Sequence, residues 1–190
     1  RVHRYSRQIF AVMGRHSHLR IAMLVLMPLV TKARPGYIGG QIVNERAFAA
    51  LDASGAITAW GSSSSGGSGA PSGSGFVSIY STSSAFAALD ASGAITAWGY
   101  SSNGGSGAPS GSGFVSIYST GSAFAALDAS GAITAWGDSQ YGGSGAPSGS
   151  GFVSIYSTPR AFAALDASGA ITAWSHGSYG GSGEPSGSGF

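Results

Sequence analysis

One block of sequence recurs four times along the chain at a constant interval of 38 residues. The block AFAALDASGAITAW is identical in every copy, and each copy is followed by a GGSG segment and a Pro-Ser-Gly-Ser-Gly tract. A repeat of this length is one supersecondary unit, which cannot bury its apolar surface alone and must pack against its neighbours. The chain therefore divides into stacked units at 47–84, 85–122, 123–160 and 161–190.

The first predicted strand of a unit is the segment FVSIYS, as at Phe76–Ser81. Its residues alternate in the manner of a strand, so we expect Phe76 and Tyr80 on one face and Val77 and Ile79 on the other. A strand that carries apolar residues on both faces is expected where every small sheet packs between two similar sheets.

The repeated block predicts a hairpin. Its two strands are Phe86–Leu89 and Ala94–Trp98, in which Ile and Thr favour extended structure. The segment Asp90–Gly93 lies between them, where the Asp side chain can accept backbone N–H groups and Gly can take a positive φ. Three consecutive antiparallel strands form a meander, which disfavours a parallel β-helix.

The predicted fold class is all-β, a propeller-type array of about four three-stranded antiparallel blades. In the first set, 38–44 (IGGQIVN) takes the place of FVSIYST without matching it, so the repeat domain is 38–190. The sequence stops at Phe190, which aligns with Phe76 at the start of a further strand. We therefore expect a fragment of a larger propeller, or an array that completes its ring by self-association.

A separate basic segment, 1–37, precedes the repeats. Residues 1–44 contain seven basic and no acidic residues, whereas the rest of the chain contains two basic and seven acidic residues. The apolar run Ile21–Val30 is too short for a stable membrane span, but it suits the centre of a signal peptide at 13–33. The protein is thus predicted to be secreted or on the cell surface. An organellar transit peptide and an ordinary N-terminal helix in a cytoplasmic protein are the alternatives.

The copies differ from one another mainly in two windows, one after the Trp and one before AFAAL. In an up-down-up meander both windows lie at the same end of the sheets. Exposed aromatic and polar side chains in such loops are typical of recognition surfaces, although neutral drift in loops is the alternative interpretation. The candidate binding residues are Tyr100, Asn103, Asp138, Gln140, Tyr141, Arg160, His176 and Tyr179.

The repeats lack the residue patterns of catalysis and metal binding. His176 is the one histidine after residue 44, the chain has no cysteine, and the Gly-rich tracts lack the Lys of a phosphate-binding loop. The Trp ladder is assigned to packing and the Asp series to hairpin turns. We expect no enzyme activity, catalytic residue, metal or cofactor. The basic segment lacks a nucleic-acid-binding motif, so no nucleic acid is expected as a partner.

The segment FAALDASGAITAWG, followed by Tyr141-Gly-Gly in the third copy, resembles the regulator of chromosome condensation repeat family. The resemblance covers 38–190, and the 38-residue period is similar to the shorter blades of the beta-lactamase inhibitor protein II group. Ser175 departs from the pattern, since Gly follows Trp in the other copies. The resemblance implies a propeller used for protein recognition, and its matching positions build blades and carry no binding residues.

These observations predict a non-catalytic module that recognises a protein partner through one rim of the blades. A structural or adhesive surface protein without a specific partner is one alternative. The non-catalytic part of a larger enzyme is the other.

Overall fold

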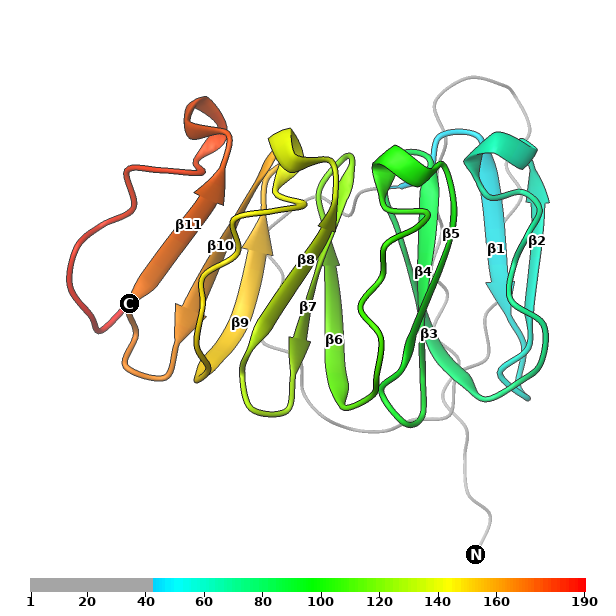
Figure 1. Ribbon diagram of the computed structural model, residues 1–190, viewed down its shortest axis with the longest axis horizontal. Coiled ribbons are helices and arrows are strands. Elements are labelled where there is room, and N and C mark those ends of the chain that lie inside the picture. Colours follow the sequence, from blue (N-terminus) through cyan, green and yellow to red (C-terminus); the bar gives the residue numbers. More distant parts are fainter. Residues whose placement is uncertain (1–42) are drawn as a thin grey trace, which may run out of the picture.

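The computed structural model describes residues 43–190 as a row of small antiparallel sheets (Figure 1). The first sheet contains β1 (Ala47–Leu51) and β2 (Ile57–Gly61). The second contains β3 (Phe76–Ser81), β4 (Ala85–Asp90) and β5 (Ile95–Gly99). The third contains β6 (Phe114–Ser119), β7 (Ala123–Asp128) and β8 (Ile133–Gly137). The fourth contains β9 (Phe152–Ser157), β10 (Ala161–Asp166) and β11 (Ile171–Ser175).

This arrangement confirms the all-β, propeller-type array of three-stranded blades. Successive strands pair antiparallel in the order in which they occur, as the meander requires. From here on, a unit means one sheet with the turns between its strands and the loop that follows its last strand. The first described sheet has two strands, because most of its predicted third strand, 38–44, lies outside the described residues. The basic segment 1–37 and the predicted export signal 13–33 also lie outside them.

The DASG hairpin forms as predicted. In the second sheet, one carboxylate oxygen of Asp90 accepts the Ser92 N–H at 2.8 Å, the Ser92 hydroxyl at 2.7 Å and the Ala94 N–H at 2.9 Å. Gly93 closes the turn at φ 82°, and a Cβ there would lie 2.6 Å from the Phe114 carbonyl of the next unit. Gly is therefore required both by the turn and by the close approach of the next sheet.

The prediction that Phe76 and Tyr80 share a face is wrong. The pairing of β3 with β4 shifts between Phe76 and Ser78, so Val77 is the extra residue of a β-bulge and is 46% exposed. The bulge reverses the side to which Phe76 points. Phe76 packs with Ile79 against the preceding sheet, whereas Tyr80 packs against the following one.

The core lies between the sheets. We call the face toward the preceding unit the leading face and the face toward the following unit the trailing face. In the second sheet the leading face carries Phe86, Ala88 and Trp98, and the trailing face carries Leu89 and Ile95. Each leading face meets the trailing face of the sheet before it, which confirms that every internal sheet packs between two similar neighbours.

An aromatic pair joins the two strands of each hairpin. Phe86 and Trp98 are opposite each other in the register and stack with centroids 5.2 Å apart. The Trp98 Nε1–H donates to the Gly66 carbonyl of the preceding unit at 3.0 Å. The same bond recurs from Trp136 and Trp174, so these three Trp residues belong to the core, as predicted, whereas Trp60 is exposed.

Candidate functional site

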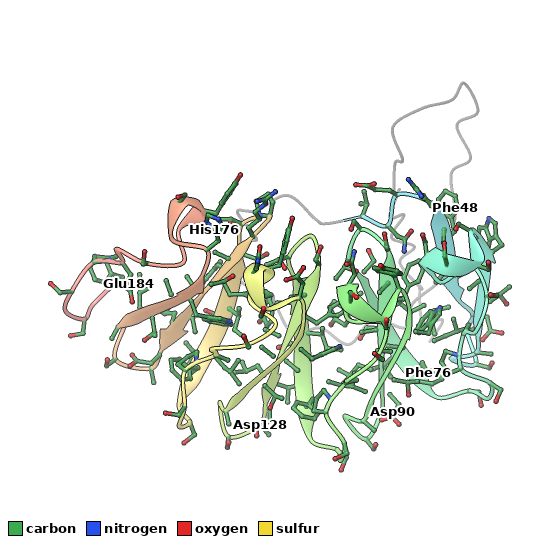
Figure 2. The ribbon with its side chains drawn as sticks, turned by 45° about the horizontal axis from the view of Figure 1, so that its top comes forward. Phe48, Phe76, Asp90, Asp128, His176 and Glu184 are labelled. Carbon is green, nitrogen blue, oxygen red and sulfur yellow. The ribbon has the colours of Figure 1, made fainter. Side chains whose placement is uncertain are left out.

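The rim is the end of the sheets that carries four one-turn 3-10 helices and the turns that precede β1, β4, β7 and β10. The helices are η1 (Ser63–Ser65), η2 (Ser101–Asn103), η3 (Ser139–Tyr141) and η4 (Gly177–Tyr179). The opposite end carries the DASG hairpins; Figure 2 shows His176 at the rim and Asp90 and Asp128 at the other end.

Hydrogen bonds hold the two variable windows together within a unit. The Tyr100 N–H donates to the Ser84 carbonyl at 2.9 Å, and the Asp138 N–H donates to the Ser122 carbonyl at 3.0 Å. In each pair the donor lies in the window after the Trp and the acceptor in the window before AFAAL. The prediction that both windows share one end of the sheets is thus confirmed.

A buried Thr stabilises the same turn through hydrogen bonds of its side chain. The Thr120 hydroxyl donates to the Tyr141 carbonyl at 2.8 Å and accepts the Ala123 N–H at 3.1 Å. In the first unit Asn44 takes this position, because its side chain donates to the Ser65 carbonyl at 2.8 Å and accepts the Ala47 N–H at 2.9 Å. The rim is therefore supported in the same way even where the sequence departs from the repeat.

Four of the predicted binding residues gather into one cluster at the last two units. We call Tyr141, Arg160, His176 and Tyr179 the Arg160 cluster. The Arg160 guanidinium carbon lies 5.0 Å from the centroid of the Tyr141 ring and 4.8 Å from that of the Tyr179 ring. His176 meets Tyr179 edge to face with centroids 5.0 Å apart. These distances are those of cation–π and T-shaped aromatic contacts.

The cluster depends on contact between neighbouring units. Tyr141 belongs to η3 after the third sheet, whereas Arg160 lies in the turn before β10 and Tyr179 in η4. The Gly121 N–H donates to the Pro159 carbonyl at 2.9 Å, which holds the turns of the two units side by side. Residues from three separate segments thus form one surface.

The other four predicted residues lie in the same rim but outside the cluster. Tyr100 precedes η2 and is 51% exposed. The Asn103 amide donates to the Ser83 hydroxyl at 3.2 Å, and one carboxylate oxygen of Asp138 accepts the Gln140 N–H at 2.8 Å. Asn103 and Asp138 therefore stabilise the loops that carry them, and Tyr100 and Gln140 are the two residues of this group that are exposed.

Ser175 is a strained position that lies outside the predicted site residues. It has φ 94°, and it is the one residue other than Gly with a positive φ within residues 43–190. The Ser175 hydroxyl and Nδ1 of His176 are buried without a hydrogen-bond partner in that part of the chain. The sequence did carry a signal for this strain, because Ser175 follows Trp174 where the other copies have Gly after Trp. The strained residue directly precedes His176, a member of the Arg160 cluster.

The carboxylates at the hairpin end serve the turns. Two hydrogen bonds lower the pKa of Asp90 below its ordinary value, and the bond from the Ser92 hydroxyl has a larger effect than the bond from the Ala94 N–H. The Asp residues of the other hairpins have the same kind of environment, and their pKa is lowered as well. Across residues 43–190, no three His, Asp or Glu side chains come together in a way that could hold a metal ion. In the same range, no helix has the length and apolar character needed to cross a membrane.

The fold and the site together define a propeller-type repeat array with a variable rim. No protein-family model matches the chain, and no curated protein matches it.

Proposed function

We propose that this protein is a non-catalytic recognition module that binds a protein partner through the rim, with the Arg160 cluster at the centre of the contact. One observation supports this proposal above the others. Four residues at positions where the copies differ, Tyr141, Arg160, His176 and Tyr179, converge in the structure, although they come from three segments. Drift in independent loops would not favour such convergence.

The chemistry of the cluster fits a carboxylate-bearing partner. Tyr and Arg are the residue types most enriched at the centres of protein interfaces. The two Tyr rings hold the Arg160 side chain in place, which reduces the entropy that it loses on binding. The guanidinium donates no hydrogen bond within residues 43–190, so its N–H groups can meet a carboxylate in the bidentate geometry typical of Arg.

The resemblance to the regulator of chromosome condensation repeat family agrees with this proposal, since propellers of that family recognise proteins. The signal peptide predicted at 13–33 supports the proposal that the interaction takes place outside the cell. Mass spectrometry of the native product tests the export proposal, because recovery of an intact intracellular chain that starts at Arg1 would contradict it.

A purely structural or adhesive role is the second candidate. The observation that favours it is the near identity of the units, together with the window Ser62–Ser65, which carries no aromatic or charged side chain. A protein of this kind would fold but would show no saturable partner.

The chain offers a matched control for the Arg160 cluster. Arg46 occupies the same turn position in the first unit as Arg160 in the last, but it has Ser62–Ser65 beside it in place of Tyr rings. The test begins with peptides selected from a random displayed library on the wild-type protein. Their affinities are then measured for R160A, Y179A and R46A.

Recognition through the cluster predicts that R160A and Y179A weaken binding by about tenfold or more, whereas R46A changes it by less than about twofold. An equal loss for R160A and R46A would show attraction by net charge alone. Selected peptides that bind R160A as tightly as wild type would place recognition elsewhere. Either result would overturn the proposal.

A further inference from the structure

We infer that two copies of this chain bind head to tail, with the leading face of the first described sheet in one molecule seated on the trailing face of the fourth sheet in another. The internal structure supplies the template for this contact. The same leading-face and trailing-face residues meet between every pair of neighbouring sheets. Within residues 43–190, no sheet packs on the leading face of the first sheet or on the trailing face of the fourth, and these two faces are the two halves of that contact. The inference rests on the fold and is independent of the proposed function.

The first half is the leading face of β1 and β2. Phe48 and Trp60 stack with centroids 5.4 Å apart, in the same pairing as Phe86 with Trp98. They are 42% and 44% exposed, whereas Trp136 on an internal leading face is 4% exposed. Nε1 of Trp60 has no hydrogen-bond partner among the described residues, although its counterparts donate to a Gly carbonyl of the preceding unit. The aromatic pair is thus already in the form that fits a trailing face.

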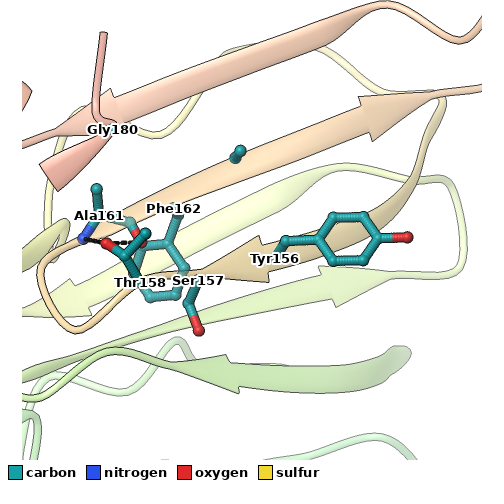
Figure 3. A pocket seen from close by; sticks show the side chains of 7 residues that line it. Tyr156, Ser157, Thr158, Ala161, Phe162 and Gly180 are labelled. Carbon is teal, nitrogen blue, oxygen red and sulfur yellow. Dashed lines mark hydrogen bonds between the residues drawn. The ribbon is translucent and has the colours of Figure 1, made fainter. Parts of the chain in front are cut away.

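The second half includes a hollow beside Gly180 on the trailing face of the fourth sheet (Figure 3). At the internal position Gly104, a Cβ would lie 2.6 Å from the Phe124 ring of the next sheet, because that ring packs directly on the Gly backbone. At Gly180 the nearest atom to such a Cβ is in Thr158 of the same unit, at 3.9 Å. The hollow measures about 210 Å³. A cavity of about 150 Å³ accepts a benzene ring, so the Phe48 ring can be accommodated.

A second hollow continues the same face. It is lined by Tyr156, Leu165, Ile171 and Phe190 and measures about 370 Å³. The Phe190 N–H donates to the Gly169 carbonyl at 3.2 Å, the bond that the first residue of each next strand makes to the preceding hairpin. Phe190 therefore already occupies one position of the next unit, and within residues 43–190 no sheet packs on the remaining apolar surface, which matches a β1–β2 hairpin.

Two residues of the last unit, Pro159 and Glu184, differ from those of the earlier units and make this contact weaker than the internal ones. Backbone N–H groups of successive rim turns donate along the array from Glu45 to Ser83 to Gly121 to Pro159, but Pro159 has no N–H with which to continue. Glu184 stands where the earlier units have Ala, and its carboxylate accepts the Ala173 N–H of the β11 edge at 3.3 Å. We therefore expect reversible association that depends on concentration.

The contact joins unlike faces, so each molecule keeps one open face of each kind and the assembly grows in one direction, as a ring or a chain. The test uses sedimentation of the full chain at increasing concentration. L165E places a charge on the trailing face. W60E places one on the leading face, and A50E does so without removing a ring of the Phe48–Trp60 pair. V153E is the matched control, because Val153 is exposed on β9 and lies outside both hollows.

The expected result is that wild type and V153E increase in mass with concentration, whereas L165E, W60E and A50E remain monomers with an unchanged far-ultraviolet spectrum. An equimolar mixture of L165E and A50E should form a dimer and nothing larger, because each variant supplies the face that the other lacks. The inference is wrong if wild type remains a monomer throughout, if a single-face variant associates like wild type, or if the folded variants do not complement each other.

Discussion

Replacing Ser175 by Gly should stabilise the fourth sheet. Ser175 has φ 94°. At the equivalent position, the other units have Gly61, Gly99 and Gly137, with φ from 106° to 108°. A residue with a Cβ in this region costs on the order of 1–2 kcal/mol. Its buried hydroxyl, which has no hydrogen-bond partner in the described chain, adds about 1 kcal/mol at the low end of such penalties. The greater freedom of Gly in the unfolded chain offsets about 0.4–1 kcal/mol. The expected net gain in the free energy of unfolding is about 1.5 kcal/mol.

The hydrogen bonds of the other units show what the substitution should restore. The residue after this Gly donates its N–H to the rim turn in the first three units, from Ser62, Tyr100 and Asp138 at 2.9, 2.9 and 3.0 Å. Within the described residues, His176 makes no equivalent bond to the Arg160 carbonyl. Gly at 175 should let this bond form, and slower amide hydrogen exchange at His176 would report it.

Thermal and urea unfolding measure the gain. For a chain of this size, 1 kcal/mol corresponds to about 2–4 °C in Tm, so S175G should raise Tm by about 3–6 °C. The mirror variant G137S should lower it, because a Cβ at Gly137 lies 2.7 Å from the Ser122 carbonyl. S62G is the control, since Ser62 has φ −64° and gains nothing from Gly. An S175G protein no more stable than wild type would refute the reasoning.

Two further predictions test the core and the hairpins. W136A should destabilise the fold by about 3–5 kcal/mol, because Trp136 is buried, stacked on a Phe and hydrogen-bonded, whereas W60A at an outer face should cost far less. Equal losses in urea unfolding would contradict the stacking described above. The pKa of Asp90 is lower in the folded chain, so its ionised form stabilises the fold above about pH 4, and this stabilisation is lost as the pH falls through the lowered value. D90N should therefore lose stability at pH 7 and approach wild type in acid, and a constant difference between pH 7 and pH 2 would contradict this.

The amino-acid sequence alone determined the strands, the hairpins and the common rim. These features depend on local signals that repeat four times, such as the Asp and Gly of the turn and the apolar residues of FAAL and AITAW. The up-down-up order of three short strands is enough to place both variable windows at one end.

Only the tertiary structure decided which side chains meet. The bulge at Val77 moved Phe76 to the other face, because a one-residue shift in pairing does not alter the hydrophobic pattern on which the prediction was based. Arg160 lies between two Tyr rings because neighbouring units stack, and Tyr141 is in the preceding unit. Trp60 and Trp136 end identical copies of the repeated block but differ elevenfold in exposure, 44% against 4%, because burial depends on the position of a sheet in the row.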